Sequence, residues 1–256
     1  MNTLLETHEP DMNSCEPRTC ALFLDLDGTL VEIASAPEGV VAPRRLAEFL
    51  GDLTMCLGGA LAIISGRPIS DVDRILAPLA PSAAGIHGAE LRAAPGGPIE
   101  YRATAIEANL VANVRRLIDE YPGVLVETKR ASIAVHYRQA PSVDAGLEVE
   151  LRRMLEDDKL DHLILAPGRK VLEIVPRHIS KGAALEAMMD LPAFRGRRPI
   201  MIGDDASDQS AFDAALRLGG IGLKVAGEHF APDEADFSGP AEVRAWLQHI
   251  AEAPAS

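Results

Sequence analysis

The sequence predicts an α/β protein whose parallel sheet is interrupted by a second domain of different architecture. In the first and last thirds of the chain, short apolar runs alternate with helix-like segments, which is the pattern of parallel βαβ units. Between residues 103 and 175 the order is helix, two strands, helix, two strands, and the short links between paired strands indicate antiparallel hairpins. We therefore expect a core of residues 19–100 and 176–256, an inserted domain of residues 101–175 and a disordered tail of residues 1–18.

The bulk composition is typical of a globular chain and excludes several classes of partner. Hydrophobic residues make up 47% and charged residues 25% of the 256 positions, which suits a chain that buries a core. The net charge of −13 argues against nucleic acid or an anionic membrane as a partner. No apolar run approaches the roughly 18 residues of a membrane span, and three sparse cysteines favour a reducing compartment. We expect a cytoplasmic monomer.

The elements of the first third follow from local residue patterns. Short apolar runs predict three buried strands, at residues 21–26, 60–65 and 83–86. A proline suits the first turn of a helix, and on this basis two helices are expected, at residues 43–50 and 68–79.

Inside the inserted segment, helical and strand patterns alternate. A turn or hinge, Ala-Pro-Gly-Gly-Pro at 94–98, precedes it. Apolar residues at helical spacing predict helices over 105–121 and 143–155. Strand-like runs predict two hairpins, built from 124–128 with 132–138 and from 163–166 with 171–175.

The parallel pattern resumes after residue 176. Ser180-Lys181-Gly182 is expected to open a helix that runs to Met189. Two further strands and two further helices complete the core, at residues 198–202, 221–225, 207–216 and 240–251.

Polar side chains that suit phosphoryl chemistry follow the apolar strands or open helices. Asp25 and Asp27 come directly after the first strand, and two carboxylates so close need a cation or a raised pKa. Asp25 could attack an electrophile to form an acyl phosphate, while Asp27 could give and later take a proton. Asp204 could complete a Mg²⁺ site with Asp25. Ser65 and Lys181 could contact the transferring phosphoryl group.

Each of these signals has a structural alternative when it is taken alone. An Asp-Gly pair is common in turns, Ser65 could simply cap a helix, and Lys181 could be a solvated helix residue. Their joint occurrence, in order and at strand ends or helix starts, favours the functional interpretation.

Four strings carry a resemblance to a known superfamily: DLDGTL at 25–30, ISGR at 64–67, SKG at 180–182 and GDDASD at 203–208. Together they resemble the motifs of the haloacid-dehalogenase-like (HAD) phosphatases. The resemblance implies a Rossmann-like core and an inserted cap of the C2B type at the position of the insertion found here. It covers residues 20–250, nearly the whole chain.

The resemblance also implies a role for each motif residue. Asp25 would be the nucleophile and Asp27 the general acid and base, and Ser65 and Lys181 would bind the phosphoryl group. Mg²⁺ would be held by Asp25, the backbone carbonyl of Asp27 and Asp204. Asp205 and Asp208 would support the site from behind, with Asp208 orienting Lys181 or metal-bound water.

Strand alternation divides the first hairpin of the insertion into a polar and an apolar face. With a turn at Arg130-Ala131, Glu127 lies opposite Ala134, and the polar face carries Glu127, Lys129, Ser132, His136 and Arg138. If this polar face points toward the active site, these residues would form a sugar-binding surface. The alternative is an ordinary solvated face.

Further strings are similar to those of the trehalose-6-phosphate phosphatases: GIHGAELR at 85–92, VETKRASIAVHYR at 126–138 and GRKVLEIVP at 168–176. The resemblance implies that sugar hydroxyls contact Glu127, Lys129 and Glu173, with Arg138 on the same face. It also implies that the cleft is lined by Arg67, His87 and Glu90. Glu173 has the structural alternative of an ion pair with Lys170 or Arg177.

These resemblances imply Mg²⁺-dependent hydrolysis of trehalose 6-phosphate, a small-molecule partner. Alternatives are a phosphatase of sucrose 6-phosphate or mannosylglycerate phosphate, a sugar phosphomutase, and a non-enzymatic sugar-phosphate sensor. One departure from the family is Gln209, where an acidic residue usually follows Asp208. We expect Gln209 to alter metal affinity or rate without abolishing function.

Overall fold

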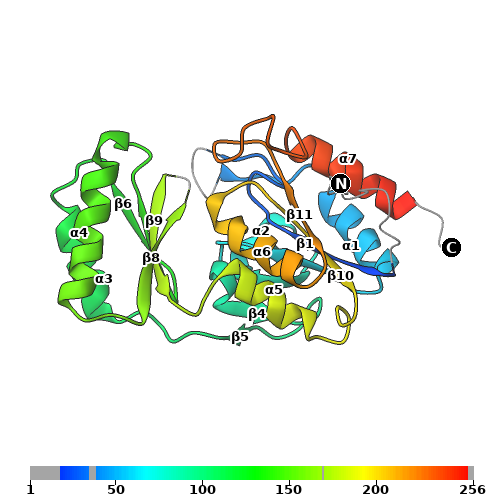
Figure 1. Cartoon of the computed structure of the whole chain (residues 1–256), viewed down its shortest axis with the longest axis horizontal. Helices are drawn as coiled ribbons and strands as arrows, with labels where there is room; N and C mark the ends of the chain where they lie inside the picture. Colours follow the sequence, from blue (N-terminus) through cyan, green and yellow to red (C-terminus); the bar gives the residue numbers. More distant parts are fainter. Residues whose placement is uncertain (1–17, 35–38, 169, 253–256) are drawn as a thin grey trace, which may run out of the picture.

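The computed structural model of the chain describes residues 18–34, 39–168 and 170–252, and these residues form two sheets, each with its own apolar core (Figure 1). The expected tail of residues 1–18 falls outside the described residues except for Arg18. No helix among the described residues is long and apolar enough to cross a membrane.

The larger sheet has seven strands in the order β11-β10-β1-β2-β3-β4-β5. Their bounds are β1 Cys20–Leu24, β2 Leu61–Ile64, β3 Ser82–Gly85, β4 Glu90–Arg92, β5 Glu100–Tyr101, β10 Arg198–Gly203 and β11 Ile221–Lys224. The five predicted strands, β11, β10, β1, β2 and β3, are parallel to one another. Chain order reverses on either side of β1, and in such sheets ligands bind beyond the strand ends at this switch point.

Helices cover this sheet. They are α1 Leu46–Cys56, α2 Ile69–Ile75, α5 Lys181–Met189, α6 Gln209–Arg217 and α7 Pro240–Glu252. Helices α5 and α6 pack against one another, and α1 and α7 also touch. The expected helix at 43–50 starts late and runs longer, because Arg45 has a φ of 69°, which a right-handed helix does not allow.

Two short strands, β4 and β5, were not predicted. They extend the sheet in antiparallel fashion, with Leu91 opposite Glu100. The segment 94–98 is therefore the turn between them and not a hinge into the insertion. Strands of three and two residues are too short to show a period-2 pattern.

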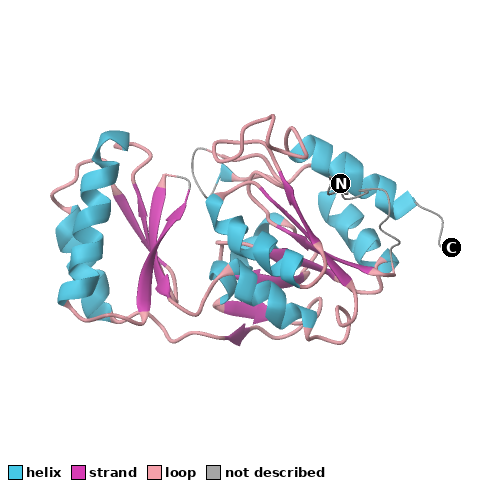
Figure 2. Ribbon diagram, viewed as in Figure 1, coloured by secondary structure: helices cyan, strands magenta, loops and turns pink. Residues whose placement is uncertain are grey.

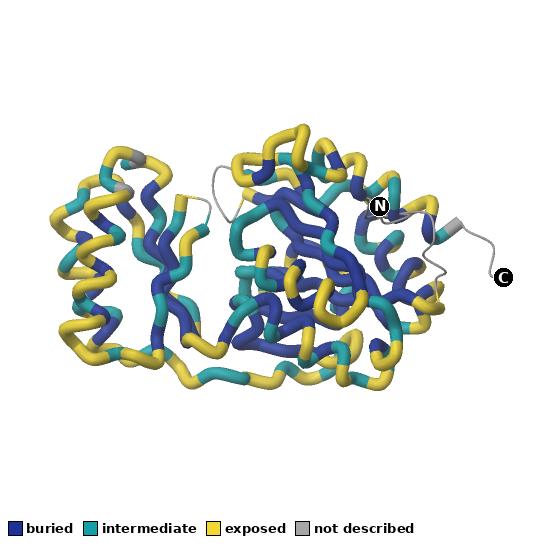
Figure 3. The backbone as a smooth tube through the Cα atoms, viewed as in Figure 1, coloured by how far each residue is buried: buried dark blue, intermediate teal, exposed yellow. Residues whose placement is uncertain are grey.

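The smaller sheet belongs to the insertion and has the predicted order of elements. These are α3 Ala108–Ile118, β6 Leu125–Thr128, β7 Ile133–His136, α4 Asp144–Asp157, β8 Leu163–Gly168 and β9 Val171–Pro176, with the antiparallel order β6-β7-β9-β8. Helices α3 and α4 cover its outer face, and its other face looks toward the larger sheet (Figure 2). The central strands of both sheets are mostly buried, whereas the edge strands β5 and β6 have no buried residue (Figure 3). We call the smaller unit the cap; its C2B class and its boundaries at 101 and 175 stay predictions.

The tip of the β6–β7 hairpin rests on the larger domain. Ala131 at the tip packs in a small buried cluster with Ile86 and Ile179. The guanidinium group of Arg130 lies 4.1 Å from the ring centroid of Tyr101, a cation–π distance. The cap is thus held against the core at its hairpin tip as well as through its two connections.

Candidate active site

The two aspartates that follow β1 and β10 meet because their strands are neighbours. Leu24 pairs with Ile202 in parallel register, and the backbone N–H of Asp25 donates to the carbonyl of Ile202 at 2.9 Å. The loop then needs glycine at position 28, where φ is +81° and an added Cβ would lie 2.1 Å from Oδ2 of Asp204. The strand order and the glycine together seat Asp204 beside the loop that carries Asp25.

Lys181 is buried between two carboxylates at the start of α5. Its Nζ donates to Oδ1 of Asp25 at 2.8 Å and to Oδ1 of Asp208 at 2.6 Å. Burial alone would lower the pKa of Lys181, but Asp208 and Asp25 raise it above its usual value, so the ammonium stays charged. Ser180 caps the helix by accepting the N–H of Ala183 at 3.0 Å, which sets where Lys181 begins the helix.

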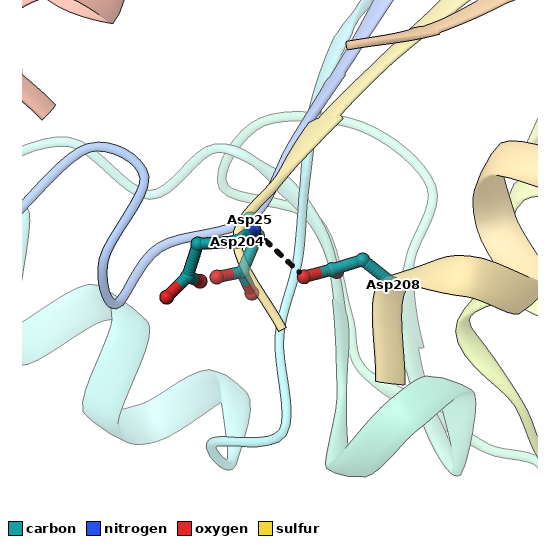
Figure 4. A group of neighbouring side chains, drawn as sticks. All are labelled: Asp25, Asp204 and Asp208. Atoms are coloured by element: carbon teal, nitrogen blue, oxygen red, sulfur yellow. Dashed lines mark hydrogen bonds between the residues drawn. The ribbon is translucent and has the colours of Figure 1, made fainter. Parts of the chain in front are cut away.

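Both carboxylate oxygens of Asp208 accept hydrogen bonds. One oxygen pairs with Lys181, and the other accepts the backbone N–H groups of Asp204 and Asp205 at 3.1 and 3.0 Å. Figure 4 shows the bond to Asp204 and the closeness of the three carboxylates. Asp208 therefore orients both the lysine and the loop that carries Asp204.

The three carboxylates form a site that fits a divalent cation. Oxygens of Asp25, Asp204 and Asp208 lie within 4.8 Å of one another, and all three residues are buried (Figure 4). Burial raises the pKa of Asp25 well above its usual value, Lys181 opposes this, and Asp208 and Asp204 add to it. Among the described residues of this cluster, one ammonium group faces three carboxylates, so a divalent cation would balance the remaining charge. Hard oxygen ligands of this kind suit Mg²⁺.

Gln209 directly follows Asp208, but its side chain is bonded outside this cluster. Its side chain is exposed on α6, and its Nε2 donates to Oδ1 of Asp213 at 2.8 Å. The expected effect of Gln209 on metal affinity or rate stays a prediction.

Asp27 is paired with Arg67. Nε of Arg67 lies 2.6 Å from Oδ2 of Asp27, and Nη2 lies 2.8 Å from Oδ1. Burial works against the charge of Arg67, yet Asp27 raises the pKa of Arg67 above its usual value. Both residues line the cavity described below, and the contact between them was not predicted.

Ser65 and Glu90 do not line the cavity, although Glu90 was expected to line the cleft. Ser65 is buried, its Oγ accepts the N–H of Arg67 at 3.1 Å, and it does not line the cavity. Glu90 is also buried and also absent from the lining; its Oε2 accepts the N–H of Ile69 at the first residue of α2, at 2.8 Å. Both side chains therefore hold the loop between β2 and α2.

Glu173 joins the cap to the core. Its Oε1 accepts from Nζ of Lys129 at 2.9 Å and from Oγ of Ser132 at 2.6 Å, and its Oε2 lies 2.7 Å from Nε2 of His87. Burial would raise the pKa of Glu173, but Lys129 and His87 bring it well below its usual value. Lys129 also donates to the carbonyl of Gly66 at 2.9 Å. These partners, rather than Lys170 or Arg177, satisfy the Glu173 carboxylate.

The cap face that looks toward the core is polar on one half and apolar on the other. Register places Glu127 opposite Ala134, as predicted, and Oε2 of Glu127 lies 2.9 Å from Nε2 of His136, which lowers the pKa of Glu127. Arg138 lines the same cavity. The other half of the face was missed, although strand alternation could have revealed it; it is formed by Ile164, Ala166, Val171 and Val175.

A cavity of about 840 Å³ lies between this face and the strand ends of the core. It brings together the nucleophile candidate Asp25, the acid–base candidate Asp27 and the cap residues Glu127, Lys129 and Glu173. The volume lies in the range of pockets that enclose small organic ligands. A phosphoryl group at Asp25 and an attached polar group at the cap could therefore share one cavity.

Comparison with known proteins agrees with this arrangement. A trehalose-phosphatase family model matches residues 23–235. The trehalose-6-phosphate phosphatase of Escherichia coli (strain K12) is 37% identical over 91% of this chain and 87% of its own, and a probable trehalose-phosphate phosphatase of Sinorhizobium fredii is 39% identical over 80% and 77%. The C-terminal domain of the Candida albicans trehalose-6-phosphate phosphatase has a similar fold, with a TM-score of 0.77 at 18% identity over 91% of this chain and 93% of that one. The chain belongs to the trehalose-phosphatase family, and its α/β fold is that of the HAD phosphatases.

Proposed function

We propose that the protein hydrolyses trehalose 6-phosphate to trehalose and inorganic phosphate with the help of Mg²⁺. The observation that carries the proposal is the buried group of Asp25, Lys181 and Asp204 on the core side of a cavity whose cap side carries Glu127, Lys129 and Glu173. Membership in the trehalose-phosphatase family supports the choice of sugar.

In the first step, an oxygen of Asp25 forms a bond to phosphorus while the bond from phosphorus to the sugar oxygen breaks. The departing sugar oxygen takes the proton of Asp27. Lys181, held 2.8 Å from Asp25, favours the ionised form of the nucleophile against the effect of burial and offers positive charge to the phosphoryl oxygens. The products of this step are an aspartyl phosphate and the free sugar.

In the second step, a water oxygen forms a bond to the phosphorus of the aspartyl phosphate. The proton of that water passes to Asp27, and the bond from phosphorus to Asp25 breaks, which restores the Asp25 carboxylate. The reaction then ends with inorganic phosphate. A phosphomutase would instead return the phosphoryl group to a sugar, so release of phosphate separates these two alternatives.

Mg²⁺ would be held by Asp25, Asp204 and the backbone carbonyl of Asp27, and when bound it supplies positive charge to the phosphoryl oxygens. Asp205 and Asp208 would support this arrangement from behind. The sugar would be bound by Glu127, Lys129, Arg138 and Glu173, with Arg67 and His87 at the core side of the cavity. Closure of the cap would exclude bulk water from the aspartyl phosphate.

The test is phosphate release from a panel of sugar phosphates in the presence and absence of Mg²⁺. We expect trehalose 6-phosphate to give the highest kcat/KM, with sucrose 6-phosphate and glucose 6-phosphate well below it. Asp25→Asn should abolish turnover while its circular dichroism spectrum stays that of the wild type. Preference for another sugar phosphate would refute the substrate, and an active Asp25→Asn protein would refute the mechanism.

A further inference from the structure

The guanidinium group of Arg67 holds both oxygens of the Asp27 carboxylate. The two contacts, 2.6 Å from Nε and 2.8 Å from Nη2, form a two-pronged pair. This geometry fixes the rotation of a carboxylate as well as its position. The Arg67 side chain is only 13% exposed and that of Asp27 is 29% exposed, so water competes little for the arginine.

The backbone that carries Arg67 is held in place by the core. The carbonyl of Arg67 accepts the N–H of Ile86 at 2.9 Å, and its N–H donates to Ser65 at 3.1 Å. Two residues later, the carboxylate of Glu90 takes the N–H of Ile69. Gly85 leaves room for this packing, because a Cβ there would lie 2.9 Å from the carbonyl oxygen of Arg67. Arg67 therefore reaches Asp27 from a loop fixed by several independent hydrogen bonds.

We propose that Arg67 is a positioning residue that aims the carboxyl group of Asp27 for its proton transfers, rather than a ligand of the sugar. The inference rests on the roles proposed above for Asp25 and Asp27. The ionised Asp27 carboxylate occupies both prongs of the fork. When Asp27 carries the proton, one oxygen still accepts from Arg67 while the hydroxyl is free to donate to the departing sugar oxygen.

Two substrates with different leaving groups can distinguish an arginine that orients Asp27 from one that binds the phosphoryl group directly. A departing sugar alkoxide is strongly basic and needs the proton of Asp27. The p-nitrophenolate ion is stable without a proton, so its departure from p-nitrophenyl phosphate depends little on the acid. For both substrates kcat/KM covers the steps up to the aspartyl phosphate. An arginine that acts through Asp27 therefore affects the two substrates unequally, whereas one that binds phosphate affects both.

The experiment compares kcat/KM of Arg67→Met with that of the wild type, at saturating Mg²⁺, for trehalose 6-phosphate and p-nitrophenyl phosphate. We expect a loss of about 10²–10⁴-fold for the sugar phosphate, the range that general acid catalysis contributes, and less than about 10-fold for the aryl phosphate. Equal losses on the two substrates would overturn the proposal.

A double variant provides a second readout. The kcat/KM of Arg67→Met combined with Asp27→Asn should be no lower than that of Asp27→Asn alone, because the arginine then has no acid–base carboxyl group to orient. Losses that multiply in the double variant would overturn the proposal. If Asp27→Asn itself hydrolyses the sugar phosphate at the wild-type rate, the roles proposed for the aspartates fail, and this outcome differs from a failure confined to Arg67.

Two further variants control for structure. Arg67→Lys keeps the charge without the fork, so it should recover part of the activity on the sugar phosphate; it also repeats the substrate comparison if Arg67→Met does not fold. Arg74→Met removes a half-exposed arginine of the same helix region, 3.7 Å from Asp71, and should keep wild-type kinetics on both substrates. A thermal midpoint from circular dichroism confirms the fold of each variant.

Discussion

Replacement of Glu173 by alanine should destabilise the protein strongly, because this carboxylate is shared by cap and core. It pairs with Lys129 at 2.9 Å and with His87 at 2.7 Å, and the side chains of Glu173 and Lys129 are only 8% and 10% exposed. Removing one partner of a buried ion pair leaves the other charge without compensation, which costs about 3–5 kcal/mol. We expect Glu173→Ala to lose about that much free energy of unfolding at pH 7.

Glutamine at position 173 separates the loss of charge from the loss of hydrogen bonds. Its amide oxygen can still accept from Lys129 and Ser132, but no bond is then between two charged groups. A hydrogen bond to a charged group contributes about 1.5–3 kcal/mol and a neutral one about 0.5–1.5 kcal/mol. Because the pair with the Lys129 ammonium group would lose one of its two charges, Glu173→Gln should lose about 1–2 kcal/mol at pH 7, less than the alanine variant.

The pH dependence has a definite sign. The pKa of Glu173 in the folded protein lies well below the 4.5 of an ordinary glutamate. Its stabilising contribution is therefore fully present above pH 4.5 and is lost as the pH falls through the lower folded value. The difference between wild type and Glu173→Gln should therefore shrink as the pH falls below about 4.5.

Urea unfolding followed by circular dichroism measures these differences. Glu186→Ala is the matched control, because Glu186 pairs with Arg217 in an exposed ion pair and should lose only about 0–1 kcal/mol. The reasoning is refuted if Glu173→Ala loses no more than Glu186→Ala, or if the difference for Glu173→Gln grows as the pH falls below 4.5.

Three further predictions follow from single positions. Gly28→Ala should weaken Mg²⁺ binding by roughly 10–100-fold in calorimetric titration, because its Cβ would displace Asp204, while Gly96→Ala, at a similar φ of +69° with open space, should bind Mg²⁺ normally. Thr29→Val should increase the free energy of unfolding by about 1–3 kcal/mol, since the buried Oγ1 of Thr29 has no hydrogen-bond partner among the described residues. The thermal midpoint should rise accordingly, and a lower midpoint would contradict this. Ser180→Ala should cost about 0.5–2 kcal/mol in urea unfolding through loss of the cap of α5, and an unchanged midpoint would show that the cap contributes nothing.

Much of the fold could be predicted because its elements carry local signals. The parallel core strands are apolar runs, and the cap alternates apolar and polar residues, so the pairing of Glu127 with Ala134 followed from one turn position. The elements that escaped have no such signal. Strands β4 and β5 are too short for a period, and the start of α1 depends on the positive φ of Arg45.

The candidate site likewise has a part that could be predicted from local signals and a part that could not. The motif residues Asp25, Lys181 and Asp204 were expected together, because strand ends of a parallel sheet meet at one edge. The pairing of Arg67 with Asp27 and the positions of Glu90 and Ser65 behind the loop were not expected. These choices of partner depend on distances between segments far apart in sequence, which residue patterns do not encode.

By itself the sequence determined the reacting groups and the strand ends that carry them, since residue type and hydrophobic period are local properties. Only the tertiary structure decided that Glu173 of the cap contacts His87 of the core, which is 86 residues away in sequence. It likewise decided that Arg67 pairs with Asp27, which is 40 residues away. The physical reason is that a charged side chain pairs with whichever opposite charge the packed backbone brings within hydrogen-bond distance.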